Sequence, residues 1–219
     1  MSDRLEDALR RGPARGVGGT AQPADGEPLD RQRSELARRA LDEGLVAVAY
    51  ARAESPFGDL LVATTRKGLV KVGFLHTGSE DAMLEELAER VSPRVMEAPG
   101  RVDDVRRQLE EYFAGRRRRF ELPTDRALIR GFARDVLTQT ARIPYGSYLT
   151  YGEVAAEAGN PRAHRAAGSA LARNPIPIVI PCHRVLRSGG VIGNYGGGPE
   201  MKAQLLHLEG ANVRPLGGS

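Results

Sequence analysis

The stretch TYGEVAAEAGNPRAHRAAGSALARNP, residues 150–175, decides the fold of the second half of the chain. Thr150 followed by Glu153 is a capping box, which predicts that a short helix begins here. Asn160 with Pro161 directly after it predicts the start of a second helix, because proline costs little in the first turn of a helix. Two short helices joined by a tight Gly-Asn turn form a helix-turn-helix.

The segment NPIPIVIPCHRV, residues 174–185, follows this motif and carries the single cysteine of the chain. Its prolines disfavour a helix, so we expect an extended, buried segment that presents Cys182 at a fixed place. An isolated cysteine is most often a structural core residue. Here the adjacent His183 and Arg184 offer the base and the positive charge that a nucleophilic thiol requires. Since neighbours in an extended segment point to opposite sides, we expect a bridging water between Cys182 and His183.

The chain then passes a Ser-Gly-Gly turn at 188–190 and a glycine-rich loop at 193–198. Backbone N–H groups of such a loop approach a ligand closely, but no P-loop lysine pattern accompanies it. A final helix over 200–209 is expected to end at Gly210. Glu209 lies at this end, where a lone carboxylate is normally solvated, so it gains a functional role only with a partner.

The first half of the chain reads as a small α+β unit. The periodicity predicts strands at 46–50, 60–65, 69–75 and 94–96, a hairpin turn at 66–68, and helices at 79–91 and 102–115. Four consecutive arginines at 116–119 favour a solvated linker over a phosphate contact and mark the junction between two domains. A helix predicted over 127–142 opens the second half. Another short helix is expected over 30–43.

The composition of the chain excludes several classes of protein and of site. The chain has 219 residues, of which 41% are hydrophobic and 27% charged, as in a globular protein. The net charge of +4 permits a polyanionic partner but is weak evidence alone. A single cysteine excludes an intrachain disulfide and a cysteine-rich zinc site. With no apolar stretch of membrane-spanning length and no signal-peptide pattern, we expect a cytoplasmic protein with a reduced thiol.

These patterns divide the chain into four parts. Residues 1–44 form an N-terminal extension, which is disordered over its Gly-, Pro- and Arg-rich beginning and helical toward its end. Residues 45–120 form an N-terminal α/β domain. Residues 121–213 form a C-terminal domain with the helix-turn-helix and the cysteine, and residues 214–219 form a tail.

The pentapeptide Pro181-Cys182-His183-Arg184-Val185 resembles the active-site signature of the O6-alkylguanine-DNA alkyltransferases, the methylated-DNA–protein-cysteine methyltransferases. Further segments resemble the family in the same order: Tyr148 to Ala155, Gly159-Asn160-Pro161, Asn174-Pro175, Gly193-Asn194-Tyr195 and Leu208-Glu209-Gly210. The resemblance is strong over 128–210 and weak over 48–74. It implies an α+β fold, with a small RNase H-like domain before a mainly helical domain that contains a winged-helix-like helix-turn-helix.

The resemblance also implies an activity. The protein is expected to act as a single-turnover transferase that moves an alkyl group from O6-alkylguanine to Cys182, irreversibly and once per chain. O4-alkylthymine is a second candidate substrate. The expected partner is double-stranded DNA, bound through its minor groove with the damaged base flipped out. The resemblance implies a monomer that needs no cofactor, no metal and no membrane.

Site residues follow from the resemblance position by position. Cys182 is the implied acceptor, His183 takes its proton through a water, Glu209 orients His183, Asn174 holds the active-site turn, and Tyr151 donates toward guanine N3. The implied substrate contacts come from Val185, Asn194, Tyr195 and Gly196. The implied DNA contacts come from Arg165, which fills the gap in the duplex, from Tyr151, and from a small-sided face of Ala163, Ala166, Ala167 and Gly168.

Two positions depart from the family pattern. Gly196 stands where many members have serine, so a side-chain contact is lost while the backbone amide remains. His164 stands where a small alanine is frequent, which changes the fit to a groove.

Three other readings compete with this one. Alkyltransferase-like lesion-binding proteins lack the acceptor cysteine, which this chain has. A cysteine hydrolase needs a base that reaches its thiol, and the adjacent Cys182 and His183 make a poor dyad. An ordinary helix-turn-helix regulator would carry Cys182 as a core residue.

Overall fold

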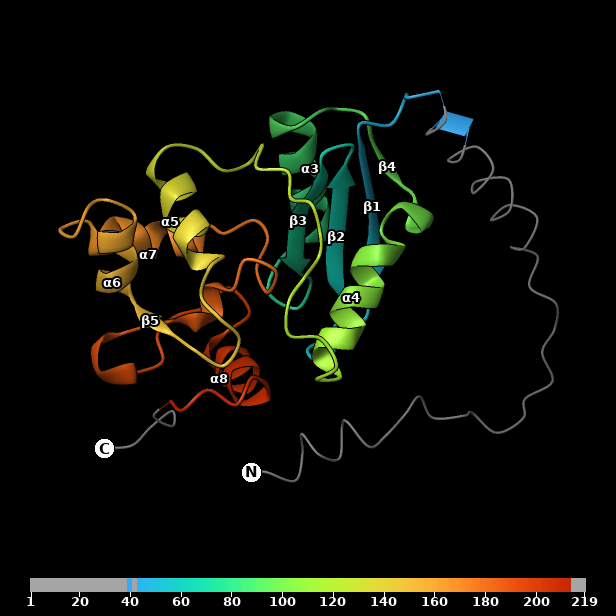
Figure 1. Cartoon of the computed structure of the whole chain (residues 1–219). Coiled ribbons are helices and arrows are strands. Elements are labelled where there is room, and N and C mark those ends of the chain that lie inside the picture. The colour runs from blue at the N-terminus through green and yellow to red at the C-terminus, as the bar shows by residue number, and fades with distance from the viewer. Residues whose placement is uncertain (1–38, 41–42, 214–219) are drawn as a thin grey trace, which may run out of the picture. The chain divides into compact units, whose positions relative to one another are not determined.

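The structure is a computed structural model that describes residues 39–40 and 43–213 (Figure 1). Residues from Val46 onward form one compact unit, and the elements named below belong to it. Arg39 and Ala40 are helical, whereas most of the helix expected over 30–43, the extension before it and the tail lie outside the described residues. Among the residues described, no helix has the length and apolar character needed to cross a bilayer.

A four-stranded sheet organises the first half of this unit. Strands β1 (Val48–Ala53), β2 (Leu60–Thr65) and β3 (Gly68–Phe74) are antiparallel neighbours. β4 (Val95–Glu97) pairs parallel with the free edge of β1, which gives the strand order β3-β2-β1-β4. The predicted strands are therefore present, with the β2–β3 hairpin closed by the pair Thr65 and Gly68.

Helices α3 (Glu80–Arg90) and α4 (Asp103–Phe113) cover opposite faces of the sheet (Figure 1). Leu60 and Val62 of β2 share a core cluster with Leu109 of α4, whereas Ala63 packs with Leu87 of α3. Because strand side chains alternate between faces, this division means that the sheet is buried on both sides. The nearly continuous apolar character of β2 follows from that burial. The short 3₁₀ turn η1 (Pro99–Arg101) leads into α4.

The arginine run at 116–119 forms ion pairs and a ring contact with the rest of the protein, so it is not a plain solvated linker. Arg117 pairs with Glu111 of α4 at 2.8 Å, and Arg116 approaches Glu110 at 3.8 Å. The Arg118 guanidinium lies 5.6 Å from the centre of the Tyr145 ring. The run thus anchors the connection between the two halves.

The helix predicted over 127–142 was too long at its start. The structure has α5 over Phe132–Thr140 only. Gly131 has φ 57°, which lies in the left-handed region and cannot belong to a right-handed helix. Leu128 and Ile129 are buried, but they lie in the irregular segment before the helix.

The helix-turn-helix consists of α6 (Tyr151–Glu157) and α7 (His164–Ala172), preceded by β5 (Leu149–Thr150). The predicted capping box is present, with the Thr150 side chain accepting from the Glu153 N–H and the Glu153 carboxylate accepting from the Thr150 N–H. The predicted start of the second helix at Asn160 and Pro161 was wrong.

Residues 161–163 form a turn, and α7 begins without a side-chain cap. The Asn160 carbonyl accepts from the Ala163 N–H at 3.0 Å, so the local signal produces a turn instead of a helix start.

The remaining elements are short, apart from the last helix. They are the 3₁₀ turn η2 (Cys182–Arg184), β6 (Val185–Leu186), the turn η3 (Ser188–Gly190) and α8 (Pro199–Leu208). β6 pairs parallel with β5, which links the cysteine segment to the helix-turn-helix. Gly210 follows α8 with φ 68°, as expected for a glycine that ends a helix.

Candidate active site

Two tight turns deliver Cys182, in place of the extended segment that the prolines predicted. The Val179 N–H donates to the Pro177 carbonyl at 2.9 Å, around Ile178 with φ 72°. The Cys182 N–H donates to the Ile180 carbonyl at 2.8 Å, which closes a second three-residue turn. A left-handed β-branched residue such as Ile178 costs on the order of 1–3 kcal/mol, and such strain concentrates at functional sites.

The turns are held because the two halves of the unit pack around them. Ile176 and Ile178 are fully buried. The Val72 N–H of β3 donates to the Pro175 carbonyl at 2.8 Å. The sheet half therefore supports the backbone that presents the cysteine.

Asn174 holds the thiol and the loop at once. Its Nδ2 donates to Cys182 Sγ at 3.2 Å and to the Ile180 carbonyl at 2.8 Å, and its Oδ1 accepts from the Ile176 N–H at 3.1 Å. Burial raises the pKa of the Cys182 thiol, while the Asn174 hydrogen bond and the charge of Lys202 oppose that rise. The thiol is thus held in place but keeps its proton until a base removes it.

His183 and Glu209 form a buried pair behind the cysteine. His183 Nε2 lies 3.0 Å from Glu209 Oε1, and neither side chain is exposed. Burial lowers the pKa of His183, although the hydrogen bond and charge of Glu209 oppose this shift. His183 is therefore a neutral base at physiological pH.

Glu209 has several hydrogen-bond partners, so it is not the solvated carboxylate that is usual at the end of a helix. Arg184 grips both carboxylate oxygens, Nε to Oε2 and Nη2 to Oε1, each at 2.8 Å. Burial alone would raise the pKa of Glu209, but hydrogen bonds and charge from His183 and Arg184 outweigh it and lower the pKa to about 2. The carboxylate is ionised under all ordinary conditions.

Sequence reasoning missed two further contacts of Glu209. The Tyr112 hydroxyl of α4 donates to Oε1 at 2.6 Å. The Gly146 N–H lies 3.3 Å from Oε2, and a Cβ on Gly146 would come within 2.8 Å of the Glu209 carbonyl oxygen. Gly146 also has φ 75°, so only glycine fits this approach. No local pattern in the sequence links these residues to Glu209.

Two buried polar atoms lack a hydrogen-bond partner in the described part of the chain, namely His183 Nδ1 and the Tyr195 hydroxyl oxygen. The His183 and Tyr195 rings lie 6.3 Å apart and nearly perpendicular. Among these residues, no hydrogen bond joins the Cys182 thiol to the His183 ring, although the His183 backbone forms one with the sulfur. A proton that moves from the thiol to this ring needs an intermediate carrier such as water.

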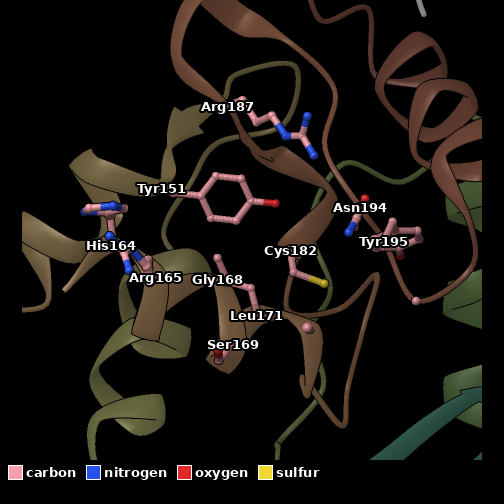
Figure 2. A pocket seen from close by; sticks show the side chains of 12 residues that line it. Tyr151, His164, Arg165, Gly168, Ser169, Leu171, Cys182, Arg187, Asn194 and Tyr195 are labelled. Atoms are coloured by element: carbon pink, nitrogen blue, oxygen red, sulfur yellow. The ribbon is translucent and has the colours of Figure 1, made fainter.

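A cavity of about 570 Å³ opens in front of Cys182. Figure 2 shows the Tyr151 ring and the Cys182 thiol within it, with His164 and Arg165 on one side and Asn194 and Tyr195 on the other. Its lining comes from α6, α7, η2, the residue after β6 and the glycine-rich loop: Tyr151, His164, Arg165, Gly168, Ser169, Leu171, Ala172, Cys182, Arg187, Asn194, Tyr195 and Gly196.

Seven of the expected site residues line this cavity: Tyr151, Arg165, Gly168, Cys182, Asn194, Tyr195 and Gly196. Others lie behind it, where Asn174, His183 and Glu209 form the network described above. Val185 is fully buried, and its carbonyl accepts from Lys202 Nζ at 2.5 Å. Arg187 lines the cavity and was not anticipated, since one basic residue beyond a turn carries no distinctive signal.

Lys202 is a fully buried cation that sequence reasoning also missed. Its Nζ lies 5.8 Å from the centre of the Tyr151 ring. Burial lowers the pKa of Lys202 to about 8, although the nearby Cys182 opposes the shift. The ammonium group therefore adds positive potential beside the thiol.

The exposed face of α7 carries most of the expected DNA contacts. Arg165 and Ala166 are exposed, and Ala163 and Gly168 are half-buried. The expectation for Ala167 was wrong, because this residue is fully buried and packs inside the domain. The small residues of α7 therefore occupy two faces of the helix, and Ala167 lies on the face that packs against the rest of the domain.

The glycine-rich loop rests on the sheet half. Thr77 Oγ1 donates to the Gly196 carbonyl at 3.1 Å, and His76 Nε2 lies 3.3 Å from the Gly197 carbonyl. The Phe74 and Tyr195 rings lie 5.6 Å apart. The wall of the cavity opposite α7 is thus supported by residues distant in sequence.

The described residues hold no cluster of three or more His, Cys, Asp or Glu side chains suited to a metal ion. The chemistry available at the site is that of a buried thiol, a neutral imidazole, a fixed carboxylate and a phenol. Together these groups serve a nucleophile that attacks a ligand in the cavity while its proton leaves toward His183.

Two family models match the chain. The ribonuclease-like domain of 6-O-methylguanine DNA methyltransferase matches residues 48–126, and the DNA binding domain of the same family matches residues 131–211. The first match agrees with the expected RNase H-like fold of the sheet half.

Curated relatives extend over most of the chain. The methylated-DNA–protein-cysteine methyltransferase of Methanosarcina acetivorans is 37% identical over 162 residues, 74% of this chain and 98% of the relative. The constitutive methylated-DNA–protein-cysteine methyltransferase of Bacillus subtilis is 36% identical over 163 residues, 73% of this chain and 94% of the relative.

Solved structures agree. The O6-methylguanine methyltransferase of Mycobacterium tuberculosis has a TM-score of 0.64 at 34% identity, covering 78% of this chain and 96% of that one. The OGT protein of the same organism in complex with DNA has a TM-score of 0.63 at 35% identity, covering 74% of this chain and 92% of that one.

Proposed function

The chain belongs to the 6-O-methylguanine DNA methyltransferase family, and on this basis we propose that it repairs DNA by moving the alkyl group of O6-alkylguanine to Cys182. The observation that carries this proposal is the thiol at the floor of a cavity, with a neutral base and an ionised carboxylate behind it. O4-alkylthymine is a second candidate substrate.

The groups of the site account for every bond, electron pair and proton in the proposed transfer. Cys182 sulfur forms a bond to the alkyl carbon while the bond from that carbon to guanine O6 breaks, and the electron pair stays on the base. The thiol proton passes through water to His183 Nδ1, and Glu209 stabilises the imidazolium that forms.

The leaving base needs stabilisation as it gains charge. We assign this role to Tyr151, which donates toward guanine N3, and to backbone N–H groups of the Tyr195–Gly196 loop near O6. Burial raises the pKa of Tyr151, so the phenol keeps its proton until the base becomes negative. Asn194 and the Val185 backbone complete the proposed base contacts, and Asn174 keeps the thiol in line.

Access to the base requires that it leave the duplex, since an alkyl carbon inside the stack is out of reach of a cavity. We infer that α7 enters the minor groove with the exposed Ala166 and with the half-buried small residues Gly168 and, just before the helix, Ala163. The exposed Arg165 then occupies the space that the base vacates. The half-buried Tyr151 lines the cavity, where we expect it to meet both the DNA and the flipped base.

The transfer happens once per chain, because a thioether is stable and no second cysteine exists to remove the alkyl group. The acceptor thiol must be reduced, which is the reason for proposing a cytoplasmic location. We also propose the domain boundary near residue 120, a few residues before the first family match ends at residue 126.

The proposal is tested by incubating the protein with a duplex that contains one O6-methylguanine. We expect the peptide with Cys182 to gain one methyl group, at most once per chain, in a mass spectrum. The Cys182→Ala variant should bind the duplex as the wild type does and transfer nothing.

Binding without mass gain in the wild type would indicate a lesion-binding module. Repeated turnover would indicate a hydrolase. Either outcome would refute the proposal.

A further inference from the structure

We propose that Tyr112, a residue of the sheet half, is a positioning residue for alkyl transfer: its hydroxyl holds Glu209, the carboxylate that keeps the proton of His183 on Nε2. The inference rests on the proposed function, since it concerns the base of that reaction. It gives the sheet half a direct role in the chemistry.

Tyr112 is in direct contact with the relay. It is fully buried on α4, and its hydroxyl lies 2.6 Å from Glu209 Oε1 and 3.5 Å from His183 Nε2. These partners are 97 and 71 residues away in sequence. The hydroxyl is therefore the point at which the sheet half meets the proton path.

The directions of these hydrogen bonds follow from the ionisation of Glu209. With a pKa of about 2, its carboxylate only accepts. The Tyr112 hydroxyl must then donate its single proton to Oε1, and its oxygen presents lone pairs to His183. Burial raises the pKa of Tyr112 well above its ordinary value, so this proton stays in place.

His183 Nε2 consequently faces two oxygens that accept, Glu209 Oε1 and the Tyr112 hydroxyl. A bare nitrogen at that position would meet lone pairs on both sides. The proton of the neutral imidazole therefore resides on Nε2, and Nδ1 keeps its lone pair. Nδ1 is the unpartnered nitrogen, and it is the one free to take a proton from Cys182.

Tyr112 can be tested without disturbing its packing. Its ring lies 5.5 Å from the Phe113 ring and 5.2 Å from the Phe120 ring, and Tyr112→Phe preserves both contacts. Tyr145→Phe is the matched control. The Tyr145 hydroxyl donates to the Leu208 carbonyl at 2.9 Å, so this variant also loses one hydrogen bond to the end of α8, but none to Glu209 or His183.

The experiment measures single-turnover transfer from a methylated duplex, with protein in excess, across a pH series. We expect Tyr112→Phe to transfer roughly tenfold more slowly, the factor expected when one hydrogen bond to a charged acceptor is used fully in the transition state. Tyr145→Phe should stay within about twofold of the wild type on the same scale. DNA affinity should be unchanged in both variants.

The pH profile separates positioning from a general loss of structure. Without the hydroxyl, the Glu209 carboxylate has one donor fewer, its negative potential at His183 increases, and the pKa of His183 rises. The acid limb of the rate profile should then move to higher pH in Tyr112→Phe and stay in place in Tyr145→Phe. The charged and titratable groups that face His183 are Cys182, Glu209, Arg184, Lys202, Tyr112 and Tyr195.

Nitrogen NMR of His183 in the wild-type protein provides a readout that needs neither a variant nor activity. We expect a protonated Nε2 and a bare Nδ1. A protonated Nδ1, or equal transfer rates and pH profiles for Tyr112→Phe and the wild type, would overturn the inference. A wild type that transfers nothing would refute the proposed function instead, while the His183 pKa, followed by the same NMR in the wild type and in Tyr112→Phe, would still decide the role of Tyr112.

Discussion

Glu86 on α3 and Glu209 after α8 are both carboxylates held by two basic side chains, yet their surroundings differ. Glu86 pairs with Lys71 at 2.6 Å and with Arg90, and its side chain is 33% exposed. Glu209 pairs with His183 and Arg184, and its side chain is not exposed at all. The first cluster lies at the surface of the sheet half, and the second lies behind the cysteine.

The difference shows that the contribution of a carboxylate to stability depends on how much water surrounds it. In water, charges are screened, and an ion pair such as Glu86–Arg90 contributes little to stability. In the dry interior, each charge depends on its partners, because water cannot replace them. The Glu209 cluster is therefore rigid and costly to break, which suits a group that must hold a catalytic base.

Removal of the Glu209 charge should have the largest effect. In Glu209→Gln, Arg184 remains buried without its counter-charge, and we expect the free energy of unfolding to fall by about 3–5 kcal/mol. Urea denaturation at neutral pH measures this change. A loss below about 1 kcal/mol would mean that the buried cluster behaves like a surface pair.

Acid should destabilise the protein mainly through the same cluster. The folded pKa of Glu209, about 2, lies below its ordinary value of 4.5, so its stabilisation is complete above pH 4.5 and is lost as pH falls toward 2. The shift corresponds to about 3 kcal/mol. The pKa of His183 is lowered from 6.5, so its part of the loss begins as pH falls below 6.5.

Urea denaturation across a pH series measures this dependence. The slope between about pH 5 and pH 2 should be clearly smaller in Glu209→Gln than in the wild type. An identical slope in both proteins would assign acid unfolding to other carboxylates.

Loss of the Glu86 charge should have the smallest effect. In Glu86→Gln, the new amide oxygen can still accept from the buried Lys71, and Arg90, whose side chain is 45% exposed, stays in water. We therefore expect the free energy of unfolding to fall by less than about 1 kcal/mol. The small change should shrink further in high salt, since a partly exposed pair is screened. Methyl transfer to Cys182 should be unaffected, which a single-turnover assay checks. A loss comparable to that of Glu209→Gln would remove the contrast between the clusters.

Much of the local structure was predictable from sequence because local interactions determine it. The apolar run of β2 and the Thr150–Glu153 capping box each depend on residues a few positions apart. The predictions failed where the backbone conformation depends on residues distant in sequence. The left-handed Gly131 shortened α5, and Asn160 formed a turn before α7, since backbone angles at such positions depend on the surrounding packing.

The candidate site was predictable only where it coincides with a motif. Cys182, His183 and Asn174 lie within one short segment, and the resemblance supplied Tyr151 and Glu209. Tyr112 and Gly146 carry no motif, because their contacts to Glu209 join residues 97 and 63 positions apart. Lys202 reads as an ordinary surface lysine in an amphipathic helix, and only packing shows that it is buried.

The sequence by itself determined which chemical groups are available: one thiol, an imidazole beside it, and helices with a small-sided face for a groove. Tertiary structure alone decided how those groups ionise. The pKa values of Cys182, His183 and Glu209 depend on burial and on partners that the fold brings from both halves of the unit. Electrostatic interactions act through space and strengthen as water is excluded, so no reading along the chain provides them.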